Sequence, residues 1–267
     1  MNCVAIMGGL GNQFFQYALY RYIRENTNKG VVITKHFYDI LLKNNSFATQ
    51  REFELDKYNT IYSEVSGFIP GDYRCDKDFS DEYLKYDYVY YEGYWDDVNF
   101  FDAQSDILKK ELTLKEEYID ESMIRIADDM KSCESVSVHI RRSDYLNSVN
   151  SNLFENLQME YYMAAVAHIK ERLGTNPKLY LFSDDVEYVK EEMQDFCGCE
   201  TVIMDKKEAY KDNWVMSKTK HHIIANSTFS LWAGYLTDYE DGITVAPLKW
   251  FKDGRNRNLY RKSWSVI

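Results

Sequence analysis

The sequence predicts an α/β protein with mostly parallel sheets, and three observations carry this prediction. Short β-branched runs alternate with amphipathic segments through residues 134–267. The chain begins with an apolar run that leads into a glycine turn and a helical pattern. Three expected strands end in clusters of polar residues, which is where ligands bind in open α/β sheets. With 267 residues, the chain has room for two modest domains.

The composition excludes several classes of protein. Apolar residues make up 45% and charged residues 28%, which favours packed cores over extended disorder. The formal net charge is −11, so a broad basic surface for nucleic acid is not expected. No apolar run is long enough to cross a bilayer, and the first residues do not resemble a signal peptide. The five cysteines match no zinc-site spacing and favour reduced thiols in a cytoplasm.

Charge is distributed unevenly along the chain. Residues 72–130 contain 18 Asp and Glu against 7 Lys and Arg, whereas residues 249–262 contain six basic residues and one acid. A solvated basic surface is the simplest interpretation of the second segment. The alternative is a contact with a polyanionic ligand or with anionic lipid, which would place the protein peripherally at the inner membrane face.

The N-terminal half begins with an expected strand at residues 2–7, then a glycine turn and a helix. Backbone N–H groups at such a helix start can bind an anion or a sugar nucleotide. Gly9 and Gly11 do not form a dinucleotide fingerprint, because Phe14 stands where the third glycine belongs. On these residues alone, a plain β–α turn is the better interpretation.

Residues 83–101 form the densest aromatic stretch of the chain, interleaved with acids. Rings beside carboxylates suit the apolar faces and hydroxyls of a sugar, although core packing is the common use of such residues. A helical region is expected at 103–131, and residues 131–134 are the best candidate for a domain junction. The predicted domains are therefore residues 1–133 and 134–267.

The C-terminal half is expected to alternate strands and helices, which implies right-handed crossovers in one sheet. The expected strands cover residues 136–140, 179–182, 201–204, 223–225 and 243–246. Polar residues follow three of these strands: His139, Arg141 and Arg142; Ser183, Asp184 and Asp185; Asn226, Ser227 and Thr228. Three such clusters on one α/β unit predict a ligand crevice.

The chemistry of these clusters suits a nucleoside diphosphate. The Arg141 guanidinium can bind a diphosphate in a bidentate manner, and the Asp184 carboxylate can accept hydrogen bonds from guanine. Ser227 and Thr228 can bind phosphate at a helix start, or simply cap that helix. An Arg–Asp salt bridge that closes a surface loop is the alternative for the first cluster. Helix-dipole compensation explains Asp184 and Asp185 as well as a metal would, so no metal site is expected.

Five motifs occur in order between residues 4 and 251, at residues 8–18, 92–95, 139–145, 182–185 and 226–233. Together they resemble the bacterial α-1,2-fucosyltransferases of glycosyltransferase family 11. Ser143 stands where glycine is common in that family, and Leu231 where a second aromatic residue is common. Neither departure removes a charged group.

The resemblance implies a GT-B-type fold, with two Rossmann-like domains and a donor cleft between them. It implies inverting, metal-independent transfer of L-fucose from GDP-β-L-fucose to the 2-hydroxyl of a terminal galactose. The acceptor would be an oligosaccharide or lipid-linked glycan of the O-antigen type. No cofactor is implied beyond the donor substrate, which the C-terminal half would bind.

Site residues follow from the same motifs. Arg141 would hold the β-phosphate with His139 beside the nucleotide, and Asp184 would contact guanine. The other implied donor-binding residues are Gly9, Gly11, Asn12, Ser183, Asn226, Ser227, Thr228 and Phe229. The aromatic stretch would bind the acceptor through Glu92, Tyr94 and Trp95.

A catalytic base is not decided by the sequence. Asp144 and Glu92 are both candidates, and Asp144 has the alternative role of orienting Arg141 or Arg142. Two other functions stay open: a fucosyltransferase with another acceptor, such as a protein hydroxyl or GlcNAc, and a non-catalytic protein that binds a GDP-sugar or a glycan. Retention of the charged motif positions argues against the second of these.

Overall fold

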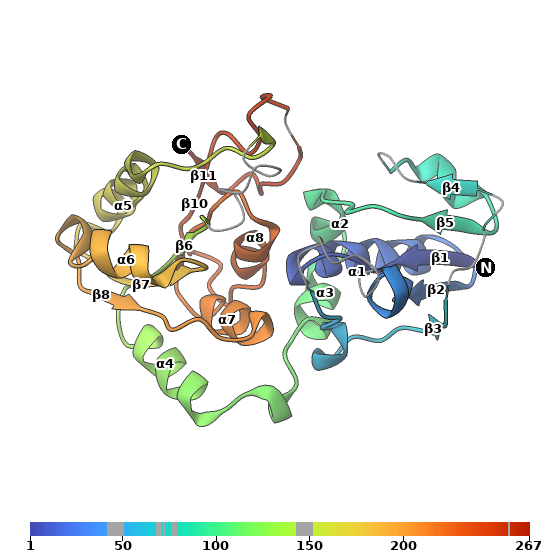
Figure 1. Ribbon diagram of the computed structural model, residues 1–267, viewed down its shortest axis with the longest axis horizontal. Helices are drawn as coiled ribbons and strands as arrows, with labels where there is room; N and C mark the ends of the chain where they lie inside the picture. The colour runs from blue at the N-terminus through green and yellow to red at the C-terminus, as the bar shows by residue number, and fades with distance from the viewer. Residues whose placement is uncertain (42–50, 68–70, 72, 76–78, 143–151, 256) are drawn as a thin grey trace. The chain divides into compact units, whose positions relative to one another are not determined.

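The computed structural model describes the chain except for residues 42–50, 68–70, 72, 76–78, 143–151 and 256. The chain divides into two compact units, residues Met1–Lys115 and Glu116–Ile267. Each unit is built on its own parallel β-sheet. Figure 1 shows both units with their helices and strands labelled.

Unit 1 contains a five-stranded sheet in the order β3-β2-β1-β5-β4, and every strand pair in it is parallel. Its strands are β1 (Asn2–Ala5), β2 (Val31–Thr34), β3 (Glu64–Val65), β4 (Tyr73–Cys75) and β5 (Val89–Tyr91). Its helices are α1 (Leu10–Asn26), α2 (Val98–Asp102) and α3 (Ser105–Glu111). The strand order reverses beside β1, because β2 lies on one side of it and β5 on the other.

Helix α1 is the main helix of unit 1 and runs along the sheet in Figure 1. Twelve of its 17 residues are buried, among them Phe14, Phe15 and Leu19. Burial of aromatic and aliphatic side chains at this density stabilises a helix far more than its intrinsic propensity does. The start of α1 is thereby held at the carboxyl end of β1.

Unit 2 contains a six-stranded parallel sheet in the order β11-β10-β9-β6-β7-β8. Its strands are β6 (Ser135–Ile140), β7 (Lys178–Ser183), β8 (Thr201–Ile203), β9 (His221–Ile223), β10 (Thr244–Ala246) and β11 (Ser265–Val266). Its helices are α4 (Glu121–Lys131), α5 (Met159–Leu173), α6 (Val186–Glu192), α7 (Ala209–Met216) and α8 (Thr228–Tyr235). Numbered from β6, the order is 3-2-1-4-5-6, that of the Rossmann fold.

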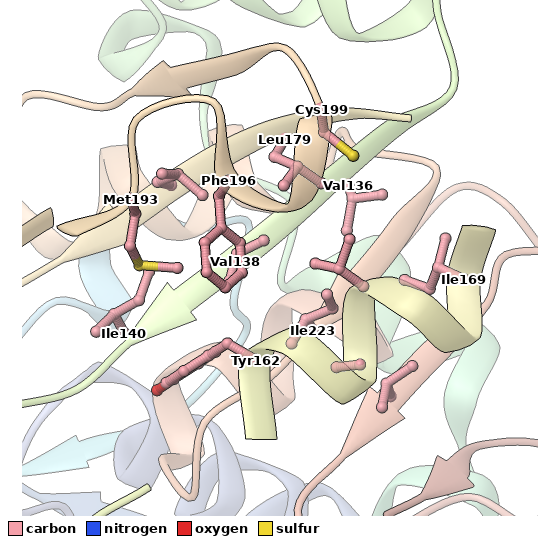
Figure 2. Close-up of a cluster of buried hydrophobic side chains, with 14 of the residues drawn as sticks. Val136, Val138, Ile140, Tyr162, Ile169, Leu179, Met193, Phe196, Cys199 and Ile223 are labelled. Atoms are coloured by element: carbon pink, nitrogen blue, oxygen red, sulfur yellow. The ribbon is translucent and has the colours of Figure 1, made fainter. Parts of the chain in front are cut away.

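One face of this sheet carries the larger apolar core, shown in Figure 2. Val136, Val138 and Ile140 of β6 alternate toward it and pack with Ile169 of α5 and Met193, which directly follows α6. Helices α5 and α6 therefore cover this face, whereas α7 and α8 lie on the other side of the sheet (Figure 1). The side chains of the intervening β6 residues, Ser137 and His139, point toward α7 and α8.

The boundary between the units lies 18 residues before the predicted junction at 133/134. The predicted helical region 103–131 is divided between the units, with α3 in unit 1 and α4 in unit 2. Contacts with α7 hold α4 in unit 2: Asp120 caps α4 and pairs with Lys211 at 3.3 Å, and the rings of Tyr118 and Tyr210 lie 5.6 Å apart. Hydrophobic periodicity predicts a helix but not the sheet on which that helix packs, so the sequence alone does not assign α4 to a unit.

Among the described residues, no helix is both long and apolar enough to span a membrane.

Candidate active site

The candidate residues of unit 2 lie at the point where its strand order reverses. Strands β6 and β9 are neighbours there, and the chain leaves them in opposite directions across the sheet. In open α/β sheets, ligands bind beyond the carboxyl ends of the two strands at such a point. Arg141 follows β6 and Ser227 follows β9, so the fold brings together two of the three polar clusters that the sequence predicts.

His139 lies inside this edge rather than on its surface. Its side chain is buried, and its ring centroid is 5.5 Å from that of Phe229 at the start of α8. Burial, followed by the nearby Arg141 charge, lowers the pKa of His139 to about 3. The imidazole is therefore neutral near pH 7 and can donate or accept a hydrogen bond without adding charge.

Arg141 is held by Asp184 at the end of β7. Its Nη1 atom lies 3.0 Å from Asp184 Oδ2, and the two side chains are 19% and 9% exposed. The other Asp184 oxygen accepts a 2.9 Å hydrogen bond from the backbone N–H of Arg142. Both carboxylate oxygens thus face the arginine loop, which gives Asp184 an observed partner other than the expected guanine.

The start of α8 has a different capping pattern from the start of α6. Asp185 caps α6 by accepting a hydrogen bond from the Tyr188 N–H, and Ser183 Oγ accepts from the Asp185 N–H at 3.0 Å. At α8, by contrast, the N-cap residue Ser227 makes no side-chain capping hydrogen bond. Ser227 and Thr228 are only half-buried. An uncapped helix start with hydroxyl groups is a suitable anion-binding position.

Asn226 was expected to contact the donor. Its side chain is buried and makes hydrogen bonds within the protein. Its Nδ2 atom donates to the carbonyl oxygens of Glu155 at 2.8 Å and Trp250 at 2.9 Å. It ties two loops together beneath the α8 start. These two hydrogen bonds give Asn226 a structural role next to Ser227, and a direct contact with the donor stays a prediction.

The glycine turn of unit 1 also lies at a reversal of strand order, beside β1 and β5. Gly8 has φ +78°, and a β-carbon on it would lie 2.8 Å from Asn12 Nδ2, so only glycine fits there. The Gly8 carbonyl accepts hydrogen bonds from Tyr38 Oη at 2.7 Å and Gln13 Nε2 at 3.3 Å. These contacts fix the turn that begins α1.

Two predicted glycines differ in exposure. Gly9 is the N-cap residue of α1, without a side-chain cap, whereas Gly11 is buried within the first turn. The Arg51 guanidinium group lies near Gly9, with its Nε atom 3.8 Å from where a β-carbon on Gly9 would be. No motif marks Arg51, so its place beside this turn is not predictable from the sequence.

The loop after β5 packs against the same turn. The buried Gln16 side chain accepts from the Met7 N–H at 2.9 Å and donates to the Gly93 carbonyl at 2.8 Å. Tyr94 is 48% exposed, and its Cε1 atom lies 3.3 Å from the β-carbon position of Gly8. The fold therefore gathers the glycine turn, Glu92 and Tyr94 at one edge of unit 1.

Trp95 does not fit the acceptor-binding role that the sequence suggested for it. Its side chain is only 6% exposed and packs edge-on against Tyr91, with the ring centroids 6.2 Å apart. Its φ angle of +55° is uncommon for a bulky residue. Trp95 is thus a largely buried residue at a turn of the backbone, next to the exposed Tyr94.

Asp144, a candidate base, lies outside the described residues. Within the ranges that the structure covers, no cluster of three or more His, Cys, Asp or Glu side chains could hold a metal ion. A cavity of about 380 Å³ in unit 1 is lined by Asn59, Ile61, Ile107, Lys110 and Glu111, and none of the candidate residues contributes to it.

A family model described as glycosyl transferase family 11 matches residues 1–267. The chain belongs to glycosyl transferase family 11. An α-1,2-colitosyltransferase of Escherichia coli is 31% identical over 92% of this chain and 91% of its own length. The O-antigen biosynthesis glycosyltransferase WbnK of Escherichia coli is 27% identical over 97% of this chain and 98% of its own length.

Solved structures support the same fold for this family 11 glycosyltransferase. The NodZ α-1,6-fucosyltransferase soaked with GDP-fucose superposes with a TM-score of 0.55 at 12% identity, covering 88% of this chain and 92% of that chain. A family 9 glycosyl transferase from Veillonella parvula gives a TM-score of 0.50 at 12% identity, over 100% and 86% of the two chains. The expected GT-B-type fold with two Rossmann-like domains is confirmed.

The sequence of this family 11 chain did not assign separate roles to Arg141 and Arg142, and it did not single out Tyr188. Arg142 lies with its guanidinium carbon 3.6 Å from the ring centroid of Tyr188, and its Nε atom lies 3.3 Å from Asp185 Oδ2. The HxRRxD run marks Arg142 but does not separate it from Arg141. Tyr188 has no such signal, because an aromatic residue in the first turn of an amphipathic helix is ordinary.

Proposed function

We propose that this family 11 glycosyltransferase transfers L-fucose from GDP-β-L-fucose to the 2-hydroxyl of a terminal galactose, with inversion and without a metal. One observation carries the proposal: an arginine oriented by a carboxylate stands beside an uncapped helix start at the strand-order reversal of unit 2. A diphosphate leaving group needs this combination of charge and N–H donors. The similarity in fold to NodZ, whose crystals were soaked with GDP-fucose, supports a GDP-sugar donor.

The residues of this chain would act on the leaving group. As the acceptor oxygen bonds to the anomeric carbon, the bond from that carbon to the β-phosphate oxygen breaks, and its electron pair leaves with GDP. Arg141 and the α8 N–H groups would stabilise the charge that develops there, in the manner of an oxyanion site. The acceptor proton would pass to a base, for which Glu92 and Asp144 are the candidates.

The acceptor would bind at the edge of unit 1 formed by Glu92, Tyr94 and the glycine turn. Tyr94 is the exposed ring of this edge, and a neutral sugar is well held by one ring face with a carboxylate beside it. Trp95 would contribute only by holding Tyr94. An acceptor from O-antigen assembly is suggested by the similarity to WbnK.

A contact with anionic lipid would bring the enzyme to a lipid-linked acceptor. Lys249, Lys252, Arg255, Arg257 and Lys262 are all exposed. Leu248, which is 65% exposed, adjoins them. Each basic residue near an anionic surface adds about 1 kcal/mol of attraction.

The test is transfer by the purified chain from GDP-fucose to an array of galactosides, with GDP release measured and the product linkage determined by NMR. We expect an α-1,2 product that persists in excess EDTA. Arg141→Ala should abolish it, and Arg141→Lys should rescue poorly, because an ammonium group cannot bind phosphate in a bidentate manner. Arg125→Ala, at a side chain that is 71% exposed, is the matched control. GDP binding without turnover on any acceptor would instead identify a non-catalytic binding protein.

A colitosyl donor is the second candidate, favoured by the similarity to the α-1,2-colitosyltransferase. Colitose is L-fucose without its 3-hydroxyl group. A site that hydrogen-bonds this hydroxyl should reject the deoxy sugar by about 10⁴-fold or more, whereas an apolar site discriminates by only about 10²-fold. The ratio of kcat/KM for the two GDP-sugars therefore decides between the donors.

A further inference from the structure

The two consecutive arginines after β6 have different surroundings. The Arg141 side chain pairs with Asp184. The Arg142 side chain points to the opposite side of the backbone, as side chains of adjacent residues in an extended segment do. The Arg142 guanidinium carbon lies 3.6 Å from the Tyr188 ring centroid, which is close stacking. Its Nε atom donates to Asp185 Oδ2 at 3.3 Å. Arg142 is thus held by α6 and turned away from Asp184.

Asp185 and Tyr188 are themselves joined, so the contact with Arg142 closes a ring of three residues. Asp185 Oδ1 accepts from the Tyr188 N–H at 3.2 Å, and Asp185 Oδ2 accepts from Arg142. Tyr188 therefore contacts Asp185 through its backbone N–H and Arg142 through its ring. A guanidinium held by both a carboxylate and a ring loses most of its rotational freedom. The side chains of Arg142 and Asp185 are 27% and 32% exposed, so solvent weakens these contacts only in part.

The backbone of the same loop is fixed as well. The Arg142 N–H donates to Asp184 Oδ1 at 2.9 Å, while Asp184 Oδ2 lies 3.0 Å from Arg141 Nη1. Rotation of the Arg141–Arg142 peptide would break the hydrogen bond to Asp184 and would shift the Arg142 side chain relative to Tyr188. The direction of the Arg141 side chain therefore depends on how well Arg142 is held.

We infer that Tyr188 is a positioning residue for donor binding. Its ring holds the Arg142 side chain against α6, and this restraint, which we call the lock, orients Arg141 toward the diphosphate. The inference rests on the proposed function, in which Arg141 binds the donor phosphate. In this role Tyr188 acts through Arg142 and not by its own contact with the substrate. Misplacement of a binding group by about 1 Å can cost up to 10²-fold in rate, so loss of one of several restraints should cost about tenfold in affinity.

The competing explanation is that Tyr188 only stabilises the first turn of α6. Removal of the ring would then lower the melting temperature and leave GDP affinity unchanged in the folded protein. The two explanations also differ in coupling. A shared lock predicts that removing Tyr188 and Arg142 together costs no more GDP affinity than removing either one, because residues in direct contact are not additive.

The experiment measures GDP binding by calorimetry, together with donor and acceptor KM, for Tyr188→Ala, Arg142→Ala, the double variant and Tyr188→Phe. We expect each single alanine variant and the double variant to bind GDP about tenfold more weakly, with acceptor KM unchanged. Tyr188→Phe keeps the ring and should bind GDP like the wild type. Lys218→Ala is the matched control, since Lys218 also contacts a ring, Trp214 at 5.3 Å, and a carboxylate, Asp238 at 2.7 Å, in unit 2.

Wild-type GDP affinity in folded Tyr188→Ala, or additive losses in the double variant, would overturn the inference. If Tyr188→Ala does not fold, Arg142→Gln applies the same criterion with the α6 turn left intact. Arg141→Ala in the same titration separates the two hypotheses. If it binds GDP normally, the proposed function fails; if it loses GDP while Tyr188→Ala does not, only the lock fails.

Discussion

Replacement of Asp184 by Asn separates two roles that its carboxylate can have at the end of β7. A residue that positions the arginine loop should affect every nucleoside diphosphate equally. A residue that accepts hydrogen bonds from guanine should have a smaller effect with IDP, which keeps the N1–H group but lacks the 2-amino group. Because both oxygens of Asp184 face the arginine loop, we expect the first result.

The structure sets the size of the expected loss. Truncation of one partner of a buried, hydrogen-bonded charge pair costs about 2–5 kcal/mol. Arg141 is 19% exposed and Asn can still accept from the Arg142 N–H, so Asp184→Asn should cost less, about 1–2 kcal/mol or roughly 5–30-fold in affinity. Asp184→Ala also leaves that N–H unpaired, which raises the loss to about 2–3 kcal/mol.

Calorimetric titration of GDP and IDP into the wild type and both variants provides the assay. Glu187→Gln, in the first turn of α6 and 79% exposed, controls for the loss of one negative charge. A two-point contact between a side chain and a base contributes about 1–3 kcal/mol of discrimination. If Asp184→Asn abolishes a GDP-over-IDP preference of that size, and so weakens GDP binding more than IDP binding, our reasoning is refuted and Asp184 binds guanine.

Three further predictions concern other parts of the chain. Tyr94→Ala should raise the acceptor KM severalfold and leave GDP affinity unchanged. Trp95→Ala should have the same effect and should also lower the melting temperature, because Trp95 is buried. An equal loss of GDP affinity would refute an acceptor role. At low salt the chain should cosediment with vesicles containing phosphatidylglycerol, whereas the double variant Lys249→Glu/Lys252→Glu should not. Identical binding to neutral vesicles would exclude attraction by charge. Burial lowers the pKa of His139, and of His222, to about 3. In the unfolded state both histidines bind protons near pH 6.5. The free energy of unfolding should therefore be highest above pH 6.5 and decrease toward pH 3, by about 1.4 kcal/mol per pH unit for each histidine. A free energy of unfolding, measured with urea, that does not change between pH 7.5 and 5 would contradict this.

The strand–helix alternation of unit 2 could be predicted because each strand is a short β-branched run. Val136, Val138 and Ile140 show the alternation directly, and the structure packs them as one face. The short edge strands β3, β4 and β11 were missed, because two or three residues carry no period. They are specified by pairing with a neighbouring strand, which is a tertiary effect.

Motif positions were predictable, but the direction of each side chain within a motif was not. Consecutive residues in extended or turning backbone point to different sides, so a motif of two neighbours commonly has one member inside and one outside. Tyr94 is 48% exposed and Trp95 6%, and Asn226 is buried beside the half-buried Ser227. The sequence assigned both members of each pair to the ligand.

This pairing follows from what a binding site requires. An outward side chain can bind with useful affinity only if its backbone is restrained, and the inward neighbour is the residue best placed to restrain it. Trp95, packed against Tyr91, restrains the neighbouring Tyr94, and Asn226 ties down the loop before Ser227. Substitution of an inward member should therefore lower stability and affinity together, whereas substitution of its outward neighbour should lower affinity alone.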